Sequence, residues 1–184
     1  MIKKIITTCI GLLLGLVLFG IGLIAIAILV TYPKLPSLDT LQHYQPKMPL
    51  TVYSSDGEVI GLYGEERREF TRIEDFPKVL KDAVVAAEDK RFYEHWGVDV
   101  IGVARAVVGN VVAGGVQSGA STITQQVAKN FYLSSERTFT RKFNEALLAY
   151  KIEQSLSKDQ ILELYFNQIY LGQRSYGFTS AAQI

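Results

Sequence analysis

The N-terminal part of the chain is a continuous apolar run. No residue from 5 to 30 is charged, and Lys3 and Lys4 lie just before this run. A helix of about 20 apolar residues can cross the ~30 Å hydrocarbon core of a bilayer, and positive charge favours the cytoplasmic side. We therefore predict a cytoplasmic tail over residues 1–4 and one transmembrane helix over residues 5–30. The alternative is a cleaved signal peptide, because Ala25-Ile26-Ala27 has the A-x-A form of a cleavage site.

The pattern changes twice after the apolar run. Residues 31–50 contain four of the five prolines and show little periodicity, which is typical of an extended linker. Residues 51–73 contain two short apolar stretches separated by Ser54-Ser55-Asp56-Gly57, and this pattern predicts β-structure with a turn. From Pro77 onward the apolar spacing is helical. The sequence therefore predicts a mainly α domain with a small β lead-in over residues 51–184.

The helix boundaries are predicted from glycines and from hydroxyl residues that can cap a helix. The spacing predicts helices from Pro77 to Glu88, over residues 99–112, after Ser121-Thr122, over residues 135–154 and from Ser157 to Gly172. Ser157 and Gln160 fit a capping box. The apolar stripe predicted for the helix over 135–154 consists of Phe139, Phe143, Leu147 and Tyr150. Because residues 180–184 look like a helix that has just begun, we expect the domain to be C-terminally incomplete.

Charge and cysteine content exclude several classes of protein. The chain of 184 residues has 19 Lys and Arg against 18 Asp and Glu, so its net charge is +1. This balance argues against a strongly basic nucleic-acid binder, and we expect no nucleic-acid partner. The single cysteine excludes an intramolecular disulfide framework and a structural zinc site built from cysteines.

The first candidate site lies at the end of the predicted helix that starts at Pro77. Glu88, Phe92 and His95 are spaced i, i+4 and i+7, which predicts that they share one helix face. A carboxylate in an apolar setting suits a general acid or base near neutral pH. The alternative is a surface ion pair of Glu88 with Lys90 or Arg91.

Two further segments combine hydroxyl groups, amides and positive charge. Ser121 and Thr122 follow a glycine-containing loop and begin a helix, where backbone N–H groups can bind an anion. The alternative there is an ordinary N-cap. Arg141 and Glu145 are spaced as a helix ion pair, which is the simplest explanation for both. The basic residues Lys129, Arg137, Arg141 and Lys142 are nevertheless concentrated enough to bind a pyrophosphate, for which arginine is well suited.

Taken together, these motifs resemble the transglycosylase domain of glycosyltransferase family 51, which occurs in class A penicillin-binding proteins and in monofunctional peptidoglycan glycosyltransferases. The matching motifs are Glu88-Asp89-x-x-Phe92-x-x-His95-x-Gly97, Gly119-x-Ser121-Thr122-x-Thr124-Gln125-Gln126 with Lys129-Asn130, Arg141-Lys142-x-x-Glu145, and Lys158-x-x-Ile161-Leu162-Glu163-x-Tyr165-x-Asn167. Tyr176-Gly177 resembles the start of a fifth motif. The resemblance covers about residues 51–184 and implies a lysozyme-like fold.

The resemblance also implies an activity and roles for residues. The family polymerises lipid II into glycan strands with inversion at the donor anomeric carbon, and undecaprenyl pyrophosphate leaves. Glu88 would be the catalytic base, and Glu145 would act at the pyrophosphate with Mg²⁺ or Mn²⁺. Glu163 and Asn167 would brace the site. The residues implied to bind substrate are Asp89, Arg91, Phe92, His95, Ser121, Thr122, Gln125, Gln126, Lys129, Asn130, Arg137, Arg141 and Lys142.

The resemblance further implies partners and a location. We expect lipid II, the undecaprenyl-pyrophosphate-linked glycan, the membrane and cell-wall assembly proteins as partners. The protein would be a single-pass protein of the bacterial inner membrane with a periplasmic domain. A full-length form would also be a transpeptidase, and residues 1–184 alone would be inactive. The alternatives are a lysozyme-like enzyme that cleaves glycan and a non-catalytic membrane-anchored assembly module.

Overall fold

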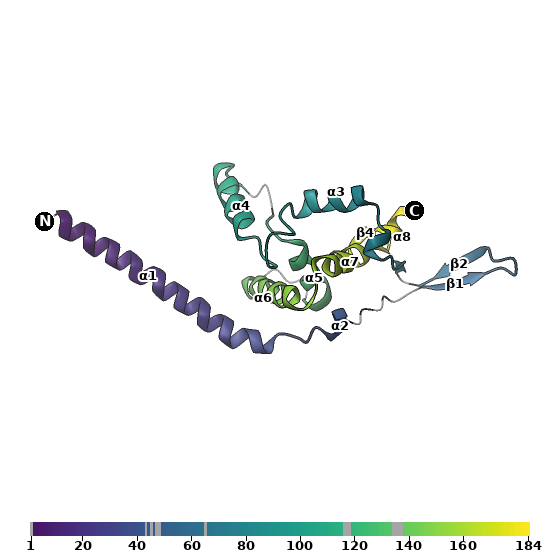
Figure 1. Ribbon diagram of the computed structural model, residues 1–184, viewed down its shortest axis with the longest axis horizontal. Helices are drawn as coiled ribbons and strands as arrows, with labels where there is room; N and C mark the ends of the chain where they lie inside the picture. The colour runs from purple at the N-terminus through teal and green to yellow at the C-terminus, as the bar shows by residue number, and fades with distance from the viewer. Residues whose placement is uncertain are drawn as a thin grey trace. The chain divides into compact units, whose positions relative to one another are not determined.

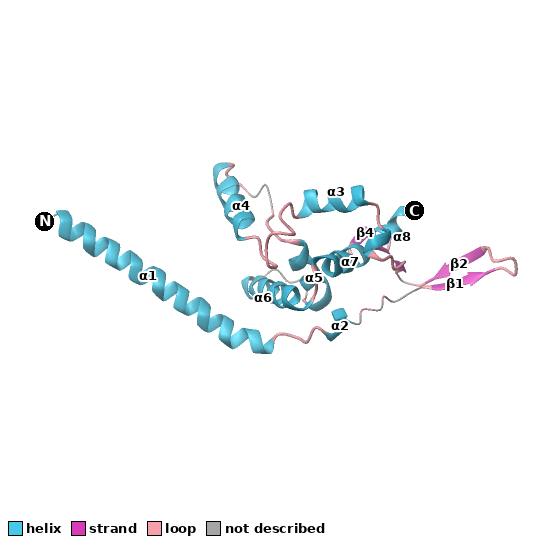
Figure 2. Cartoon of the chain, viewed as in Figure 1, coloured by secondary structure: helices cyan, strands magenta, loops and turns pink. Residues whose placement is uncertain are grey.

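The computed structural model describes residues 2–42, 44, 46, 49–64, 66–115, 119–133 and 138–184. Figures 1 and 2 show a chain built mainly from helices, with a few short strands. The elements in chain order are α1 (Ile2–Thr31), η1 (Tyr32–Lys34), α2 (Asp39–Gln42), β1 (Leu50–Tyr53), β2 (Val59–Tyr63), β3 (Arg67–Arg68), η2 (Ile73–Asp75), α3 (Lys78–Glu88), α4 (Val100–Val112), α5 (Ile123–Tyr132), α6 (Phe139–Ser155), α7 (Lys158–Gln168), β4 (Tyr170–Gly172), β5 (Ser175–Tyr176) and α8 (Phe178–Ala182). The prediction of a mainly α fold is confirmed.

The chain divides into two compact units, Met1–Pro36 and Ser37–Ile184. The first unit is the helix α1 with the short turn η1 that follows it. A stretch of 29 residues, Ile6–Lys34, is long and apolar enough to cross a membrane, and none of its most apolar window is buried. Among the described residues it is the one candidate span. A signal sequence near the N-terminus would have the same length and composition, so both interpretations given above stay open.

The core of the second unit lies where α5 packs against both α6 and α7. Its fully buried side chains include Phe92, Ile123, Leu148, Ile161 and Phe166. The rings of Phe76, Phe166 and Phe178 extend this core, with centroid separations of 4.8 and 4.6 Å. Because α7 contributes both to the packing with α5 and, through Phe166, to this ring cluster, it connects the helical core to α8.

The predicted helix over 99–112 and the capping box of α7 are confirmed, but the apolar stripe of α6 is wrong. Phe139 is 97% exposed and Tyr150 is 43% exposed. The buried face of α6 carries Leu148, Ala149 and Ile152 together with Glu145. The buried acid among apolar neighbours explains the error, since a hydrophobic pattern assigns a glutamate to the solvent side. Thr138 caps the helix by accepting a hydrogen bond from Arg141 N at 3.1 Å, and residues 135–137 of the predicted helix lie outside the described residues.

The predicted hairpin is confirmed: β1 and β2 pair antiparallel across the turn at Gly57, which has φ +89°. A second sheet, in the order β3-β5-β4, was not predicted. In it Arg67 and Arg68 pair in parallel with Ser175 and Tyr176. These strands are two or three residues long, which is too short for an alternating pattern to be visible. The helix predicted to run to Gly172 ends instead at Gln168, because the chain turns into β4.

The segment after Pro36 is docked on the domain. Leu38 and Leu41 are buried, and Leu41 lies within the short helix α2. The Tyr44 hydroxyl donates a hydrogen bond to Gln168 Oε1 at 2.6 Å, and its ring packs edge-on against Phe131 at 5.0 Å. The predicted linker over 31–50 is therefore not extended throughout, because three of its apolar side chains find partners on the helical core.

Candidate active site

The residues of the first predicted motif lie on a helix end and a loop, so the prediction of one shared helix face is wrong. Glu88 is the last residue of α3, and Phe92 and His95 lie in the connection to α4. Gly97 lies in this connection with φ +91°, and a Cβ there would be 2.7 Å from the backbone of Ala149. Because only glycine fits this position, the loop can lie directly on α6.

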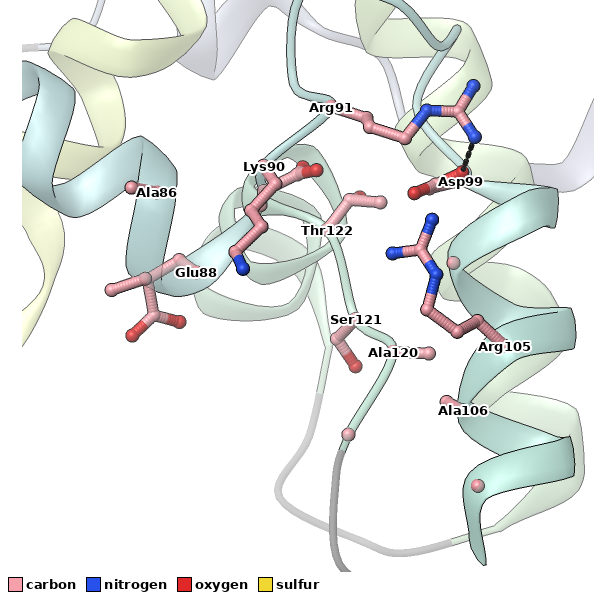
Figure 3. A pocket seen from close by; sticks show the side chains of 15 residues that line it. Ala86, Glu88, Lys90, Arg91, Asp99, Arg105, Ala106, Ala120, Ser121 and Thr122 are labelled. Carbon is pink, nitrogen blue, oxygen red and sulfur yellow. Dashed lines mark ion pairs between the residues drawn. The ribbon is translucent and has the colours of Figure 1, made fainter.

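A pocket of about 430 Å³ opens between α3, α4 and the loop before α5. Figure 3 shows Glu88 at the end of α3, Arg105 on α4, and Ser121 and Thr122 on the loop that leads into α5. Lys90 and Arg91 lie on the loop after α3, where Arg91 forms an ion pair with Asp99 at 3.4 Å. The pocket therefore brings together parts of the first two predicted motifs.

Glu88 is exposed at this pocket and has a defined partner. Its Oε2 accepts a hydrogen bond from Gln126 Nε2 at 2.9 Å. Ala86 and Ala87 beside it are exposed as well, so the expected apolar setting of this carboxylate is not found. The glutamate can meet a substrate because one of its oxygens is held by α5 while the side chain remains open to solvent.

Tyr165 on α7 lies close enough to Glu88 to be influenced by its charge. Burial is the main cause that raises the pKa of the Tyr165 hydroxyl, and the negative charge of Glu88 raises it further. The phenol therefore stays protonated at physiological pH. The sequence motif contained Tyr165, but no role was predicted for it, because its helical spacing with Ile161 and Leu164 indicated only packing.

Asp89 and His95, predicted to bind substrate, are buried and contact each other. Asp89 accepts a hydrogen bond from His95 Nε2 at 2.9 Å and another from the backbone N of Ile123 at 3.0 Å. Ile123 is the first residue of α5, where a carboxylate is favoured by the unpaired N–H groups. Phe92 is fully buried beside this pair. These three residues tie the loop to α5, and their direct contact with substrate stays a prediction.

The start of α5 combines structural caps with one accessible hydroxyl. Thr122 and Gln125 form a capping box and are buried. The Thr122 hydroxyl also donates to Gly97 O at 2.6 Å, which ties this helix start to the loop. Ser121 remains exposed, and its hydroxyl accepts a hydrogen bond from Lys142 Nζ at 2.8 Å. Ser121 thus connects the Glu88 pocket to the basic residues of α6.

Of the predicted basic residues, Arg141 and Lys142 lie together around Glu145. Glu145 is 2% exposed and accepts hydrogen bonds from Arg141 Nη1 at 2.6 Å and from Lys142 Nζ. Lys129 and Asn130 are exposed near the end of α5, and the described part of the chain shows no ion pair of Lys129. Arg137 lies outside the described residues. Two basic side chains on α6 are therefore held in place by one buried carboxylate.

The residues present do not fit a resident metal ion at Glu145. Arg141 and Lys142 occupy its two oxygens, so a cation would have to displace a positive charge from each. Among the residues that the structure describes, no group of three or more His, Cys, Asp and Glu could hold a metal ion. The Mg²⁺ or Mn²⁺ implied by the resemblance stays a prediction, and no step below depends on it.

Glu163 and Asn167 lie on α7 and hold the segment before α3. Asn167 exchanges two hydrogen bonds with the backbone of Thr71, at 2.9 and 2.8 Å. Glu163 Oε2 accepts a hydrogen bond from the backbone N of Ile73 at 2.8 Å. Their contacts fit a bracing role, since this segment leads through η2 into the helix that ends at Glu88.

Three charged residues that line the pocket were not predicted as site residues: Lys90, Asp99 and Arg105. Arg105 had a visible signal, because it is the one charged residue of the apolar helix α4. Lys90 was considered only as an ion-pair partner. These three residues meet at the pocket because of how α4 packs relative to α3 and the loop before α5, and local sequence does not specify this packing.

Comparison with known proteins gives a consistent result. A family model described as transglycosylase matches residues 56–184. Penicillin-binding protein 1A of Neisseria cinerea is 86% identical over 184 residues, and that of Neisseria gonorrhoeae is 84% identical over 184 residues. The same-named protein of Pseudomonas aeruginosa is 48% identical over 177 residues, or 96% of this chain. The chain spans 23% of the length of the Neisseria relatives and 21% of the Pseudomonas one.

Proposed function

The chain belongs to the transglycosylase family, and from this we propose that it is the glycosyltransferase part of a peptidoglycan-synthesising enzyme. Its substrates are lipid II, as the acceptor, and a growing glycan on undecaprenyl pyrophosphate, as the donor. One observation carries the proposal. The exposed carboxylate of Glu88 lines the same pocket as Ser121, whose hydroxyl binds Lys142 of the basic group. A base and an anion-binding group therefore border one site.

The reaction follows from the chemistry of these groups. Glu88 accepts the proton of the acceptor 4-hydroxyl, and the resulting oxygen nucleophile forms a bond to the anomeric carbon of the donor. The bond from that carbon to the pyrophosphate oxygen breaks on the opposite face, so the configuration inverts. Gln126 holds one oxygen of Glu88 and so orients the carboxylate. Undecaprenyl pyrophosphate leaves with the electron pair of the broken bond.

The basic residues supply what the leaving group needs. Charge-assisted hydrogen bonds from Arg and Lys are the strongest that proteins form to phosphate oxygens. Lys142, and Arg141 beside it, are already oriented by Glu145, so they need little rearrangement when the charge develops. Lys129 adds a further exposed charge on α5. We propose that any divalent cation arrives bound to the pyrophosphate.

The apolar surfaces suit a lipid-linked substrate. One wall of the pocket is α4, whose exposed side chains include Val100, Ile101, Val107 and Val111. The helix α1 is apolar enough to anchor the chain in a bilayer. We propose an inner-membrane location with a cytoplasmic N-terminus and a periplasmic catalytic domain. Confinement to the membrane raises the effective concentration of substrates that are themselves confined there.

The relatives are named for penicillin binding. We propose that the longer protein has this property too, and that its second activity is peptide cross-linking. No residue of this chain is assigned to that activity. Cell-wall assembly proteins as partners stay a prediction.

The decisive experiment measures polymerisation of labelled lipid II by the longest form of the protein and by its Glu88→Gln variant. We expect Glu88→Gln to lower the rate by about 10²- to 10⁴-fold, the typical contribution of a general base. The matched control is Asp82→Asn, which changes an exposed carboxylate on the same helix that forms an ion pair with Lys78. This control should retain the wild-type rate.

Other outcomes would contradict the proposal in distinct ways. Normal polymerisation by Glu88→Gln would mean that Glu88 is not the base. A wild-type protein that only shortens preformed glycan would be a lysozyme-like enzyme. A wild-type protein without either activity, but with bound assembly partners, would be a non-catalytic module.

A further inference from the structure

The loop that follows Glu88 rests on a partly buried cation that none of the roles above uses. Lys158 is the first residue of α7, and its side chain is 20% exposed. Its Nζ donates a hydrogen bond to the backbone oxygen of His95 at 2.7 Å and another to Glu153 Oε1 at 2.7 Å. The same Nζ lies 4.5 Å from the centroid of the Phe92 ring. The cation therefore contacts two residues of the loop and one of α6.

The three contacts fully satisfy the ammonium group. Lys has three N–H donors, and here two make hydrogen bonds while the third side of the group faces an aromatic ring. The partner Glu153 has a side chain that is 7% exposed, and it also accepts a hydrogen bond from the Thr124 hydroxyl at 2.6 Å. Buried ion pairs contribute little net stability, because both charges lose their water. What such a pair does fix is geometry.

Both ends of this network lead to Glu88. On the loop side, Lys158 holds the backbone of His95, and the ring of His95 binds Asp89, the neighbour of Glu88. On the helix side, Glu153 holds Thr124, which lies on α5 two residues before Gln126. Gln126 in turn binds Glu88. The network thus links the two structures that set the position of the carboxylate.

We propose that Lys158, together with Glu153, is a positioning residue that fixes Glu88 against Gln126 in the reactive arrangement. This inference rests on the proposed function of Glu88 as the base. Lys158 is not among the residues that line the pocket of Glu88. It acts through the loop over residues 89–97 and through α5.

The test uses the double variant Lys158→Met with Glu153→Gln in the longest form of the protein. Changing both residues leaves no unpaired buried charge, so the fold is preserved and the effect on position can be measured alone. We expect kcat for lipid II polymerisation to fall by about 10- to 100-fold, as small misplacements of catalytic groups do. KM and the thermal midpoint should change little. Lys158→Arg, which keeps N–H donors and a positive charge beside the Phe92 ring, should retain most of kcat.

Two controls separate this role from a general effect on folding. The double variant Lys78→Met with Asp82→Asn removes an exposed ion pair of α3, and it should leave kcat unchanged. Hydrogen exchange followed by mass spectrometry reports the loop directly. In the Lys158 and Glu153 double variant, amides of residues 89–97 should exchange faster, whereas those in the middle of α6 should not.

A double variant with wild-type kcat would overturn the proposal, whatever its exchange. Unchanged exchange of residues 89–97 would overturn it as well. If the double variant and Lys158→Arg lose kcat to the same extent, and both also lower the thermal midpoint, the role of Lys158 is purely structural. If the wild-type protein fails to polymerise lipid II, the proposed function fails instead, and the exchange measurement decides alone whether Lys158 holds the loop.

Discussion

At the scale of single residues, two neighbouring carboxylates have opposite environments. Glu88 is exposed and holds one hydrogen bond from Gln126, whereas Asp89 is buried between His95 and the start of α5. The end of α3 separates them, because the chain leaves the helix at this point and turns Asp89 inward. The carboxylate proposed as the base thus stays open to solvent while the next residue is anchored in the fold.

Gly97 allows a sharp test of how closely the loop must lie on α6. Alanine at Gly97 would meet the Ala149 backbone, whereas Gly57 has nearly the same positive φ and nothing within 4 Å. We expect Gly57→Ala to lower the free energy of unfolding by about 1–3 kcal/mol through backbone strain. Gly97→Ala should cost roughly 1–3 kcal/mol more, because overpacking adds to the same strain.

Chemical unfolding followed by circular dichroism measures both free energies. If the two glycine variants lose equal stability, the contact of the loop with α6 is not tight. The Gly97→Ala variant should also lose activity, since its loop carries His95, which binds Asp89.

At the scale of elements, the segment 37–44 behaves as part of the domain. Leu38 and Leu41 are 6% and 4% exposed, and Tyr44 is hydrogen-bonded to the last residue of α7. Its contacts reach α5 through Phe131, at the end of the helix that carries Gln126 and Lys129. A segment that looks like a linker in the sequence therefore supports a helix of the site.

Substitution of Leu41 tests this docking. We expect Leu41→Ala to lower the free energy of unfolding by about 2 kcal/mol or more, because a buried leucine loses its packing. The matched control is Leu50→Ala in β1, where the side chain is 66% exposed and little should change. Chemical unfolding of both variants gives the comparison. Equal stabilities would mean that the segment only lies on the surface.

At the scale of the whole molecule, the chain combines an apolar helix with a helical domain as two separate units. The core of the second unit lies among α5, α6 and α7. The contribution proposed for α1 is one of location. A catalyst and its lipid-linked substrates meet more often when they share a membrane.

Removal of residues 1–36 tests this contribution. We expect the shortened protein to polymerise lipid II in vesicles at least about tenfold more slowly, because the effective concentration at the membrane is lost. In detergent solution its kcat should match that of the intact protein. Replacement of residues 1–36 by an unrelated membrane helix should restore the rate in vesicles. A shortened protein that is fully active in vesicles would contradict the proposed role of α1 as a membrane anchor. Mass spectrometry of the membrane-bound intact protein shows whether the N-terminal segment has been removed as a signal peptide.

The sequence alone was sufficient for the apolar helix, the hairpin, and the capped helices α5 and α7. These features depend on neighbours in the chain, where periodicity and capping leave a readable pattern. The Arg141–Glu145 pair was likewise predictable, because its spacing of four residues is a local property of a helix.

Only the tertiary structure decided what depends on distant neighbours. It buried Glu145 and Asp89, paired β3 with β5 across more than a hundred residues, and turned α4 into a wall of the pocket. It also placed Lys158 beneath the loop of Glu88. Burial and contact between remote segments are set by the packing of the whole core, so the pattern of residues along the sequence does not predict them. The sequence determined which groups the chain offers for chemistry, and packing determined which of them can reach a substrate.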